Sequence, residues 1–355
     1  MGTATATSTA VQATATTLDL EPAVAGILEA IEVDDDPDSS PATGSEWGED
    51  DDATSSMVST ACRYREENGR TYHGYKDGQY LIPNDDSEQD RLDLQHEIFF
   101  LTFDNNLFLS PAGRNGEEIR RVLDIGTGTG IWALDFAYVW PDSSVIGVDL
   151  SPIQSAAAPP NVSFQIDDIE EPWTFEQKFD FIYCRMMTIG IANWPRLFEQ
   201  SYENLEPGGW IEVVDLAPLT ADDDSLKRDS ALHQWITTLT ECSERIGRTL
   251  RSASRYKEQL EAQGFENVVE VKFKWPQNRW PRDKKLKELG GLTLENIGSP
   301  VCLESISAAA YTRLLGWTKP DLDAFLKGVR RDMKDRSIHS YWPIYVVYGQ
   351  KPKSC

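Results

Sequence analysis

The first sixty residues contain no lysine and no arginine, although they include thirteen aspartate and glutamate residues. This segment carries more than half of the net charge of −24 and leaves −11 on the other 295 residues. Nucleic-acid binding depends on clustered Lys and Arg, so we do not expect direct binding of nucleic acid. A segment rich in Thr, Ala, Ser and Asp buries too little apolar surface to offset the entropy of ordering. The sequence therefore predicts a disordered acidic tail over residues 1–60.

Within that tail, five apolar residues recur at helical spacing: Leu20, Val24, Ile27, Leu28 and Ile31. Aspartates flank the stretch on both sides and keep it acidic. Two interpretations stay open, namely an amphipathic helix that docks on a partner and a transient helix in a solubilising tail.

Cysteine and histidine are scarce. The five cysteines are scattered and the four histidines are isolated, so the sequence predicts neither a metal site nor a disulfide framework. No apolar run approaches the ~20 residues that are needed to span a bilayer. The first residues lack the basic start and the apolar core of a secretion signal. We therefore expect an intracellular protein, cytoplasmic or nuclear, that is neither secreted nor inserted in a membrane.

From residue 120 onward, strand patterns alternate with helical patterns. Seven segments have the character of strands, and a helix with Ser87 as its N-cap precedes them. Such alternation predicts an α/β fold with a mostly parallel, seven-stranded sheet that has helices on both faces. The expected strands are RVLDIG, SVIGVDL, VSFQIDD, FDFIYCRMM, WIEVVDL, NVVEVKFKW and YWPIYVVYGQK.

We divide the ordered part, residues 61–355, into four segments. Residues 61–119 form an N-terminal cap, and residues 120–280 form the core. Residues 281–337 are expected to be a helical insertion before the last strand, which lies in residues 338–355. This insertion would lie above the carboxyl ends of the strands, where open α/β sheets bind ligands. Its leucines and aromatic residues could form an apolar lid over a substrate, and ordinary packing of helices against the sheet explains most of them equally well.

A glycine-rich turn follows the first core strand, with Gly126, Gly128 and Gly130 at alternate positions. The dinucleotide fingerprint requires G-x-G-x-x-G, and Ile131 replaces its last glycine. In addition, Asp124 lies just before the turn, where its charge would repel a pyrophosphate. The turn is therefore better suited to a ligand that carries positive charge near its sugar.

Acidic residues end the next two strands. Asp149 ends the second strand, where it can accept hydrogen bonds from ribose hydroxyls. Asp168 follows the third strand, where a carboxylate can accept from the amino group of adenine. Each feature alone is common in ordinary turns and caps, but all three occur in order on consecutive strands. Together they indicate a purine nucleoside with a cationic, amino-acid-like tail, as in S-adenosylmethionine.

Longer segments strengthen this interpretation, among them NGRTYHGYKDGQYLIPNDDSEQDRLDLQH, VLDIGTGTGIWALDFA, VIGVDLSPIQ and the closing YVVYGQKP. Through them the chain resembles the class I S-adenosylmethionine-dependent methyltransferases, which have a Rossmann-like fold. More narrowly, it resembles the fungal LaeA-like group, which is associated with the regulation or biosynthesis of secondary metabolites. The matching segments cover residues 64–217 and the last strand.

The resemblance implies cofactor contacts at eight positions around the ends of the strands. Three would approach the methionine part, one the ribose, two the adenine and two the methyl-transfer cleft. In that order they are Asp124, Gly126 and Gly128; Asp149; Asp168 and Ile169; Arg185 and Met186.

The expected reaction transfers a methyl group from S-adenosylmethionine to a small metabolite or a protein side chain. A general base is needed only if the acceptor must lose a proton, and His73 and His96 are weak candidates for it. One alternative is a regulatory protein that keeps the fold and works with velvet-type partners, as the resemblance suggests. Another alternative, an NAD-dependent oxidoreductase, is disfavoured by the incomplete fingerprint.

Overall fold

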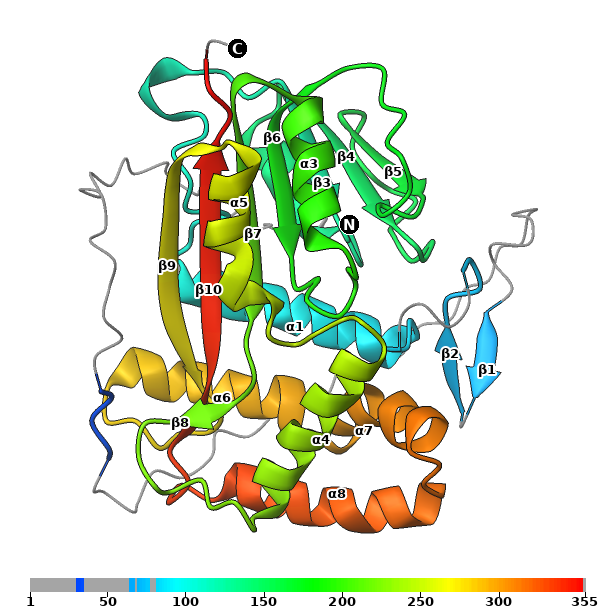
Figure 1. The fold of residues 1–355 in the computed structure, drawn as a ribbon, viewed down its shortest axis with the longest axis vertical. Helices are drawn as coiled ribbons and strands as arrows, with labels where there is room; N and C mark the ends of the chain where they lie inside the picture. The colour runs from blue at the N-terminus through cyan, green and yellow to red at the C-terminus, as the bar shows by residue number, and fades with distance from the viewer. Residues whose placement is uncertain (1–29, 35–63, 68, 77–80, 354–355) are drawn as a thin grey trace, which may run out of the picture.

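One twisted sheet runs through the molecule in the computed structural model, which describes residues 30–34, 64–67, 69–76 and 81–353 (Figure 1). Its strands are arranged in the order β5-β4-β3-β6-β7-β10, and β9 pairs with the other side of β10. The strands are β3 (Arg121–Ile125), β4 (Ser144–Asp149), β5 (Val162–Ile166), β6 (Phe179–Arg185), β7 (Leu205–Leu216), β8 (Thr220–Ala221), β9 (Glu266–Pro276) and β10 (Ser340–Gln350).

Strands β3 to β7 run parallel, whereas β10 is antiparallel to both β7 and β9. The prediction of a mostly parallel sheet with seven strands is confirmed, and the two-residue β8 adds a short continuation beside β10. Asp124 of β3 lies in register with Gly147 of β4 and Tyr183 of β6. The carboxyl ends of β3, β4 and β6 consequently meet at one edge of the sheet.

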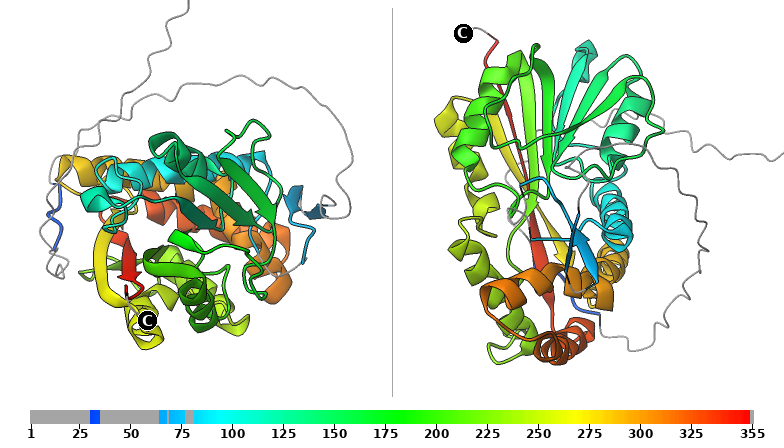
Figure 2. Two further views of the ribbon diagram at one scale, coloured as in Figure 1. Left: turned by 90° about the horizontal axis from the view of Figure 1, so that it is seen from above. Right: turned by 90° about the vertical axis from the view of Figure 1, so that its right-hand side faces the viewer.

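Helices cover both faces of this sheet (Figure 2). Helices α1 and α2 lie on one face, and α3 and α5 lie on the other. The helices are α1 (Asp86–Thr102), α2 (Ile131–Val139), α3 (Trp194–Asn204), α4 (Ala231–Arg245), α5 (Tyr256–Gln263), α6 (Lys284–Gly298), α7 (Pro300–Ala309) and α8 (Lys319–Lys334). The smaller elements are the hairpin of β1 (Arg65–Glu67) and β2 (Arg70–Tyr72), with the short turns η2 (Arg114–Gly116), η3 (Ser252–Arg255) and η4 (Ala310–Leu314).

The start of α1 differs from the sequence prediction. Its N-cap is Asp85, two residues before the expected Ser87, and the Asp85 side chain accepts from the N–H of Glu88. Asp85 has the extended backbone that an N-cap requires, whereas Ser87 already lies inside the helix. The carboxylate of Asp85 also accepts hydrogen bonds from Arg70, so a contact from β2 fixes this end of the helix.

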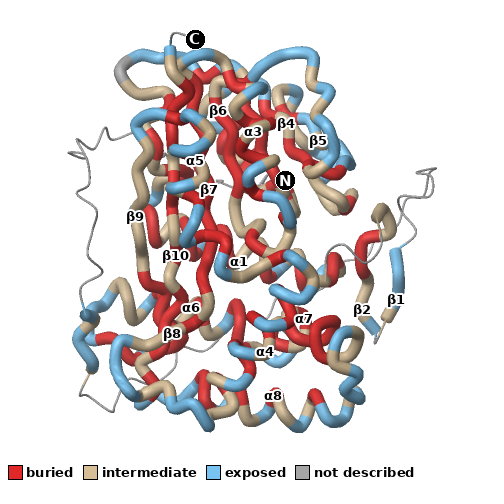
Figure 3. Tube along the Cα trace, in the orientation of Figure 1, coloured by how far each residue is buried: buried red, intermediate tan, exposed pale blue. Residues whose placement is uncertain are grey.

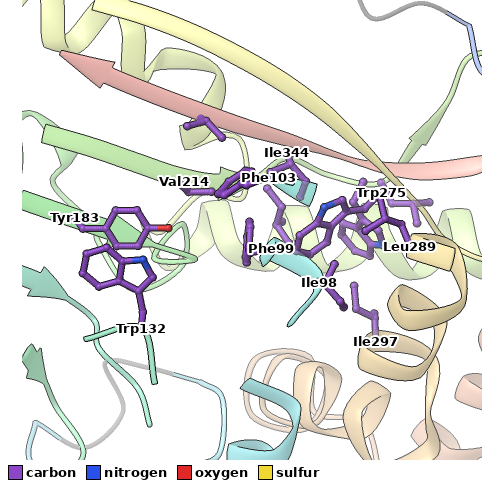
Figure 4. Close-up of a cluster of buried hydrophobic side chains, with 14 of the residues drawn as sticks. Ile98, Phe99, Phe103, Trp132, Tyr183, Val214, Trp275, Leu289, Ile297 and Ile344 are labelled. Carbon is purple, nitrogen blue, oxygen red and sulfur yellow. The ribbon is translucent and has the colours of Figure 1, made fainter. Parts of the chain in front are cut away.

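Two hydrophobic clusters hold the layers together, one on each face of the sheet. The strands β6, β7 and β10 between them are buried over most of their length (Figure 3). Val122 and Tyr183 point to the face covered by α1 and α2, while the adjacent Leu123 and Cys184 point to the face covered by α3 and α5. The ring of Trp132 from α2 stacks on that of Tyr183, with centroids 4.0 Å apart and an angle of 6° between planes (Figure 4). This stack fixes α2 directly behind the glycine-rich turn.

The segment between β9 and β10 is helical, as expected. Helices α6, α7 and α8 lie beyond the carboxyl ends of β6 and β7 (Figure 1), and α6 contacts both α1 and β9. Of the two interpretations, packing holds for most of these side chains: Leu289 and Tyr311 are buried and Phe325 packs against the same cluster, whereas Trp317 is exposed. The reason is that α6 presents its apolar face to α1 and β9.

A short piece of the expected tail makes contacts that the sequence did not indicate. Val33 forms a β-bridge with Pro281, and Asp34 forms ion pairs with Lys287 and Arg336. Residues 30–34 thus lie against both ends of the helical segment, because an acidic side chain of the tail pairs with a basic side chain at each end. The rest of residues 1–60, including most of the expected amphipathic helix, lies outside the described residues.

Candidate functional site

A cleft opens at the carboxyl ends of β3, β4, β5 and β6, beside the first half of α1. It encloses about 1110 Å³ of empty space, part of which is open to solvent. Seven of the eight positions predicted for cofactor contacts line this cleft: Gly126, Gly128, Asp149, Asp168, Ile169, Arg185 and Met186. The ends of four strands supply these residues, so the fold brings together side chains that are up to sixty positions apart in the sequence, from Gly126 to Met186.

The glycine-rich turn forms the floor of the cleft. Gly126 and Gly128 have φ values of +69° and +57°, a region that glycine enters without steric cost. A Cβ at Gly126 would lie 2.2 Å from Sδ of Met187, and one at Gly130 would lie 2.5 Å from the ring of Phe164. Glycine is therefore required both for the backbone conformation and for the close approach of neighbouring side chains.

Asp149 links the turn to the end of β4. Its Oδ2 accepts from the N–H of Gly128 at 2.9 Å, and its Oδ1 accepts from the N–H of Ser151 at 2.9 Å. The surrounding protein raises the pKa of Asp149 by desolvation, and these two hydrogen bonds oppose the rise. A carboxylate held in this way keeps lone pairs available for ligand hydroxyls.

Asp124 is the one predicted cofactor residue that does not line the cleft. It is buried beneath the turn, where its Oδ2 accepts a hydrogen bond from the hydroxyl of Thr127 at 2.6 Å. Burial raises the pKa of Asp124 to about 6, against the effects of Thr127 and of the Arg185 charge. Asp124 therefore lies below the surface of the cleft in this structure, and its contact with the methionine part of the cofactor stays a prediction. Asp124 braces the turn from below.

Asp168 and Ile169 lie at the end of the cleft beyond β5. The Asp168 Oδ2 forms an ion pair with the ammonium of Lys76 at 3.0 Å, and its Oδ1 accepts from the N–H of Glu170. Lys76 also pairs with Glu171. The N-terminal segment is thereby tied across the same end of the cleft.

Arg185 and Met186 lie at the end of β6. Met186 has a φ of +59°, an uncommon value for a residue with a side chain, and this turns the chain sharply after the strand. The guanidinium of Arg185 lies over the ring of Phe99, 4.8 Å from its centroid, and also lines the cleft. Residues from α1 and β6 thus meet at this wall.

His96 is buried behind Arg185 and does not line the cleft. Its Nδ1 lies 3.0 Å from Nη2 of Arg185, and its Nε2 lies 2.9 Å from Oδ2 of Asp135. Because an arginine can only donate, Nδ1 is the acceptor and Nε2 carries the proton. Both ring nitrogens are therefore engaged, so the geometry does not support His96 as a general base.

His73 does line the cleft, although it is almost fully buried. Its Nε2 lies 3.2 Å from the carbonyl oxygen of Lys76, within the segment that is tied to Asp168. A positive charge on its ring lowers the pKa of Asp149, which places it near the end of β4. His73 therefore forms part of the cleft wall at the end where Lys76 pairs with Asp168.

Helix α1 contributes three cleft residues that the sequence reasoning missed: Glu88, Leu92 and Gln95. They recur at i, i+4 and i+7, so they share one face of the helix. That spacing could have identified the face, but Glu88 and Gln95 are polar and did not fit an apolar stripe. Glu88 is buried, its Oε1 accepts two hydrogen bonds from Arg91, and burial raises its pKa.

A parallel sheet with a glycine-rich turn after its first strand, and a cleft at its carboxyl edge, is typical of α/β proteins that bind a ligand at the ends of the strands. Comparison with known proteins then gives the family. The family described as "Methyltransferase domain" matches residues 94–270. Methyltransferase pytC of Aspergillus terreus is 39% identical over 304 residues, covering 85% of this chain and 92% of that protein.

Two further relatives agree with this result. The probable methyltransferase tdiE of Emericella nidulans is 38% identical over 75% of this chain and 83% of its own length. The secondary metabolism regulator laeA of Monascus pilosus is 35% identical over 81% of this chain and 78% of its own length. The chain belongs to the methyltransferase family, and its cofactor is S-adenosylmethionine.

Solved structures are more distant. Phosphoethanolamine N-methyltransferase 2 of Haemonchus contortus, solved with S-adenosyl-L-methionine, is 20% identical, with a TM-score of 0.42. The alignment covers 82% of this chain and 72% of that one. Among the described residues, no helix is both long and apolar enough to cross a membrane.

Proposed function

We propose that this protein transfers a methyl group from S-adenosylmethionine to a small molecule of secondary metabolism. The observation that carries the proposal is the cleft at the carboxyl edge of the sheet, where four strand ends bring the predicted contacts together. Relatives named as methyltransferases and as a secondary metabolism regulator support this choice of acceptor class.

The residues present fit the cofactor at two points. The turn at Gly126 and Gly128 leaves no Cβ in the floor of the cleft, so a ligand can approach the backbone closely. Asp149 presents a fixed carboxylate above that turn, which suits two neighbouring ribose hydroxyls. Asp168 and Ile169 would flank the adenine. His73 and the ion pair between Lys76 and Asp168 would close the same end of the cleft.

When bound, the cofactor supplies an electrophilic methyl group on a sulfonium, so the protein need not generate a reactive species. The residues of this chain then have to align the acceptor with that carbon and exclude water. Met186 and Met187 form an apolar wall next to the turn, and Leu92 of α1 closes the cleft from above. This surrounding would disfavour attack by water.

The test is calorimetric binding of S-adenosylmethionine and S-adenosylhomocysteine to the intact protein and to Gly128→Asp. At Gly128 the backbone has a φ of +57° and the Leu92 side chain is 3.3 Å from an added Cβ, so the variant places bulk and negative charge in the floor. Micromolar binding that the variant loses, while its circular dichroism stays native, supports the site. Transfer of a radiolabelled methyl group to fungal metabolite extracts then identifies the acceptor.

A second candidate is a regulatory role in a complex with velvet-type partners. The name of the relative from Monascus pilosus, secondary metabolism regulator, favours the regulatory role, and the velvet-type partners come from the resemblance to the LaeA-like group alone. One comparison separates the two roles. A variant that no longer binds the cofactor, such as Gly128→Asp, loses an enzymatic role but keeps a purely structural role in a complex.

A further inference from the structure

Arg185 combines a position in the cleft wall with a charge that no carboxylate of the described residues contacts directly. It is half-buried, and no carboxylate of the described residues lies within ion-pair distance of it. Its charge opposes the rise in the pKa of Asp124, yet the Asp124 Oδ2 accepts from Thr127 instead. A partly desolvated guanidinium is costly unless an anion completes its hydrogen bonds.

The side chain is also held in place on both sides. One donor, Nη2, is taken by Nδ1 of His96 at 3.0 Å, and the guanidinium plane rests on the ring of Phe99. His96 is 1% exposed and is itself oriented by Asp135, whose Oδ2 lies 2.9 Å from Nε2. These contacts hold the guanidinium of Arg185 in place. They do not neutralise its charge, because the His96 ring that accepts the hydrogen bond from Nη2 is uncharged.

We propose that Arg185 is a carboxylate-binding residue of the cleft, and that His96 and Asp135 are positioning residues that act through it. A guanidinium presents its donors in a planar fork that matches a carboxylate, and a fixed fork loses little freedom on binding. The carboxylate can come from the amino-acid tail of the cofactor or from an acidic acceptor. The inference rests on the proposed function, because it requires the nucleoside to occupy the same cleft.

Calorimetry of the full chain tests both sources. In the first arm, S-adenosylmethionine is compared with its decarboxylated analogue, which lacks only the tail carboxylate. If Arg185 binds the tail, the intact protein prefers the carboxylated compound by about tenfold or more, and Arg185→Gln removes the preference. In the second arm, sodium acetate and sodium benzoate are titrated into the S-adenosylhomocysteine complex. If Arg185 serves the acceptor, this complex binds one of them and the Arg185→Gln complex does not.

The positioning role has its own readout. His96→Asn places an amide oxygen near the position of Nδ1 and keeps an acceptor for Arg185, whereas His96→Leu removes it. We expect His96→Leu to lose most of the carboxylate preference and His96→Asn to retain most of it. Equal behaviour of the two variants would show that His96 only fills space.

Binding of the decarboxylated analogue is the control that separates a failure of the carboxylate proposal from a failure of the proposed function. If Arg185→Gln binds this analogue as the intact protein does, the nucleoside site and the fold are intact. The carboxylate proposal is overturned if Arg185→Gln also keeps the preference for S-adenosylmethionine and the response to acetate and benzoate. If the intact protein binds none of the adenosyl compounds, the proposed function itself fails.

Discussion

Replacing Asp149 by Asn should weaken cofactor binding far more than the loss of one charge elsewhere on the chain. Both carboxylate oxygens accept backbone N–H groups at 2.9 Å, one from Gly128 and one from Ser151. The Asn side chain replaces one oxygen by an NH2 group. This NH2 group would face the N–H of Gly128 or of Ser151, so one of the two hydrogen bonds is lost. It also removes the charge that two ribose hydroxyls would meet.

The magnitude follows from these contacts. A hydrogen bond to a charged group contributes about 1.5–3 kcal/mol, so losing one of them changes affinity substantially. We expect the dissociation constant of S-adenosylhomocysteine to rise about 10- to 100-fold, which corresponds to about 1.4–2.7 kcal/mol. The free energy of unfolding should fall by about 1–2 kcal/mol, because the turn loses its link to the end of β4.

Calorimetry at fixed ionic strength measures the affinity, and urea unfolding measures the stability. Asp142→Asn is the matched control, since Asp142 is exposed, lies outside the cleft and changes the same charge. A folded Asp149→Asn protein that binds S-adenosylhomocysteine within about twofold of the intact chain would refute this reasoning.

Three further outcomes are expected. Burial raises the pKa of Glu212 to about 7, above that of an unfolded glutamate, so its contribution to stability is lost as pH rises from about 4.5 to 7. Glu212→Gln should therefore flatten the fall of unfolding free energy between pH 5 and 8, as urea titrations at each pH can check. Trp132→Ala should lower the free energy of unfolding by about 3–5 kcal/mol, because it removes a buried ring stacked on Tyr183. The shift of the urea midpoint measures this change. Asp34→Asn should lower the melting temperature slightly, because Asp34 pairs with both Lys287 and Arg336, and added salt should reduce the difference.

The sequence predicted the sheet well because its signals are local. Alternating strand and helix patterns predicted the seven strands. The structure shows the same kind of local signal at the start of α3, where Asn193 is the N-cap and Pro195 lies in the first turn. Local signals failed where a distant contact decided the outcome. Asp85 became the N-cap of α1 in place of Ser87, in a position where Arg70 also holds it.

For the site, the sequence indicated which strand ends matter but not which way each side chain points. Asp124 lies beneath the turn and does not line the cleft, because its carboxylate accepts from the hydroxyl of Thr127 within the turn itself. Likewise, His96 was a candidate base and lies behind Arg185 with both nitrogens engaged. No spacing in the sequence relates His96, Asp135 and Arg185, which come from three different elements.

By itself, the sequence determined the order of strands and helices, the glycine-rich turn and the acidic ends of two strands. Those features depend on backbone conformation and on side-chain periodicity, which neighbouring residues fix. Only the tertiary structure decided that α1 closes the cleft with Glu88 and Leu92, and that an uncharged His96 holds Arg185. Such contacts join residues far apart in the chain, and they form only when the packing of α1 against the sheet brings them within bonding distance.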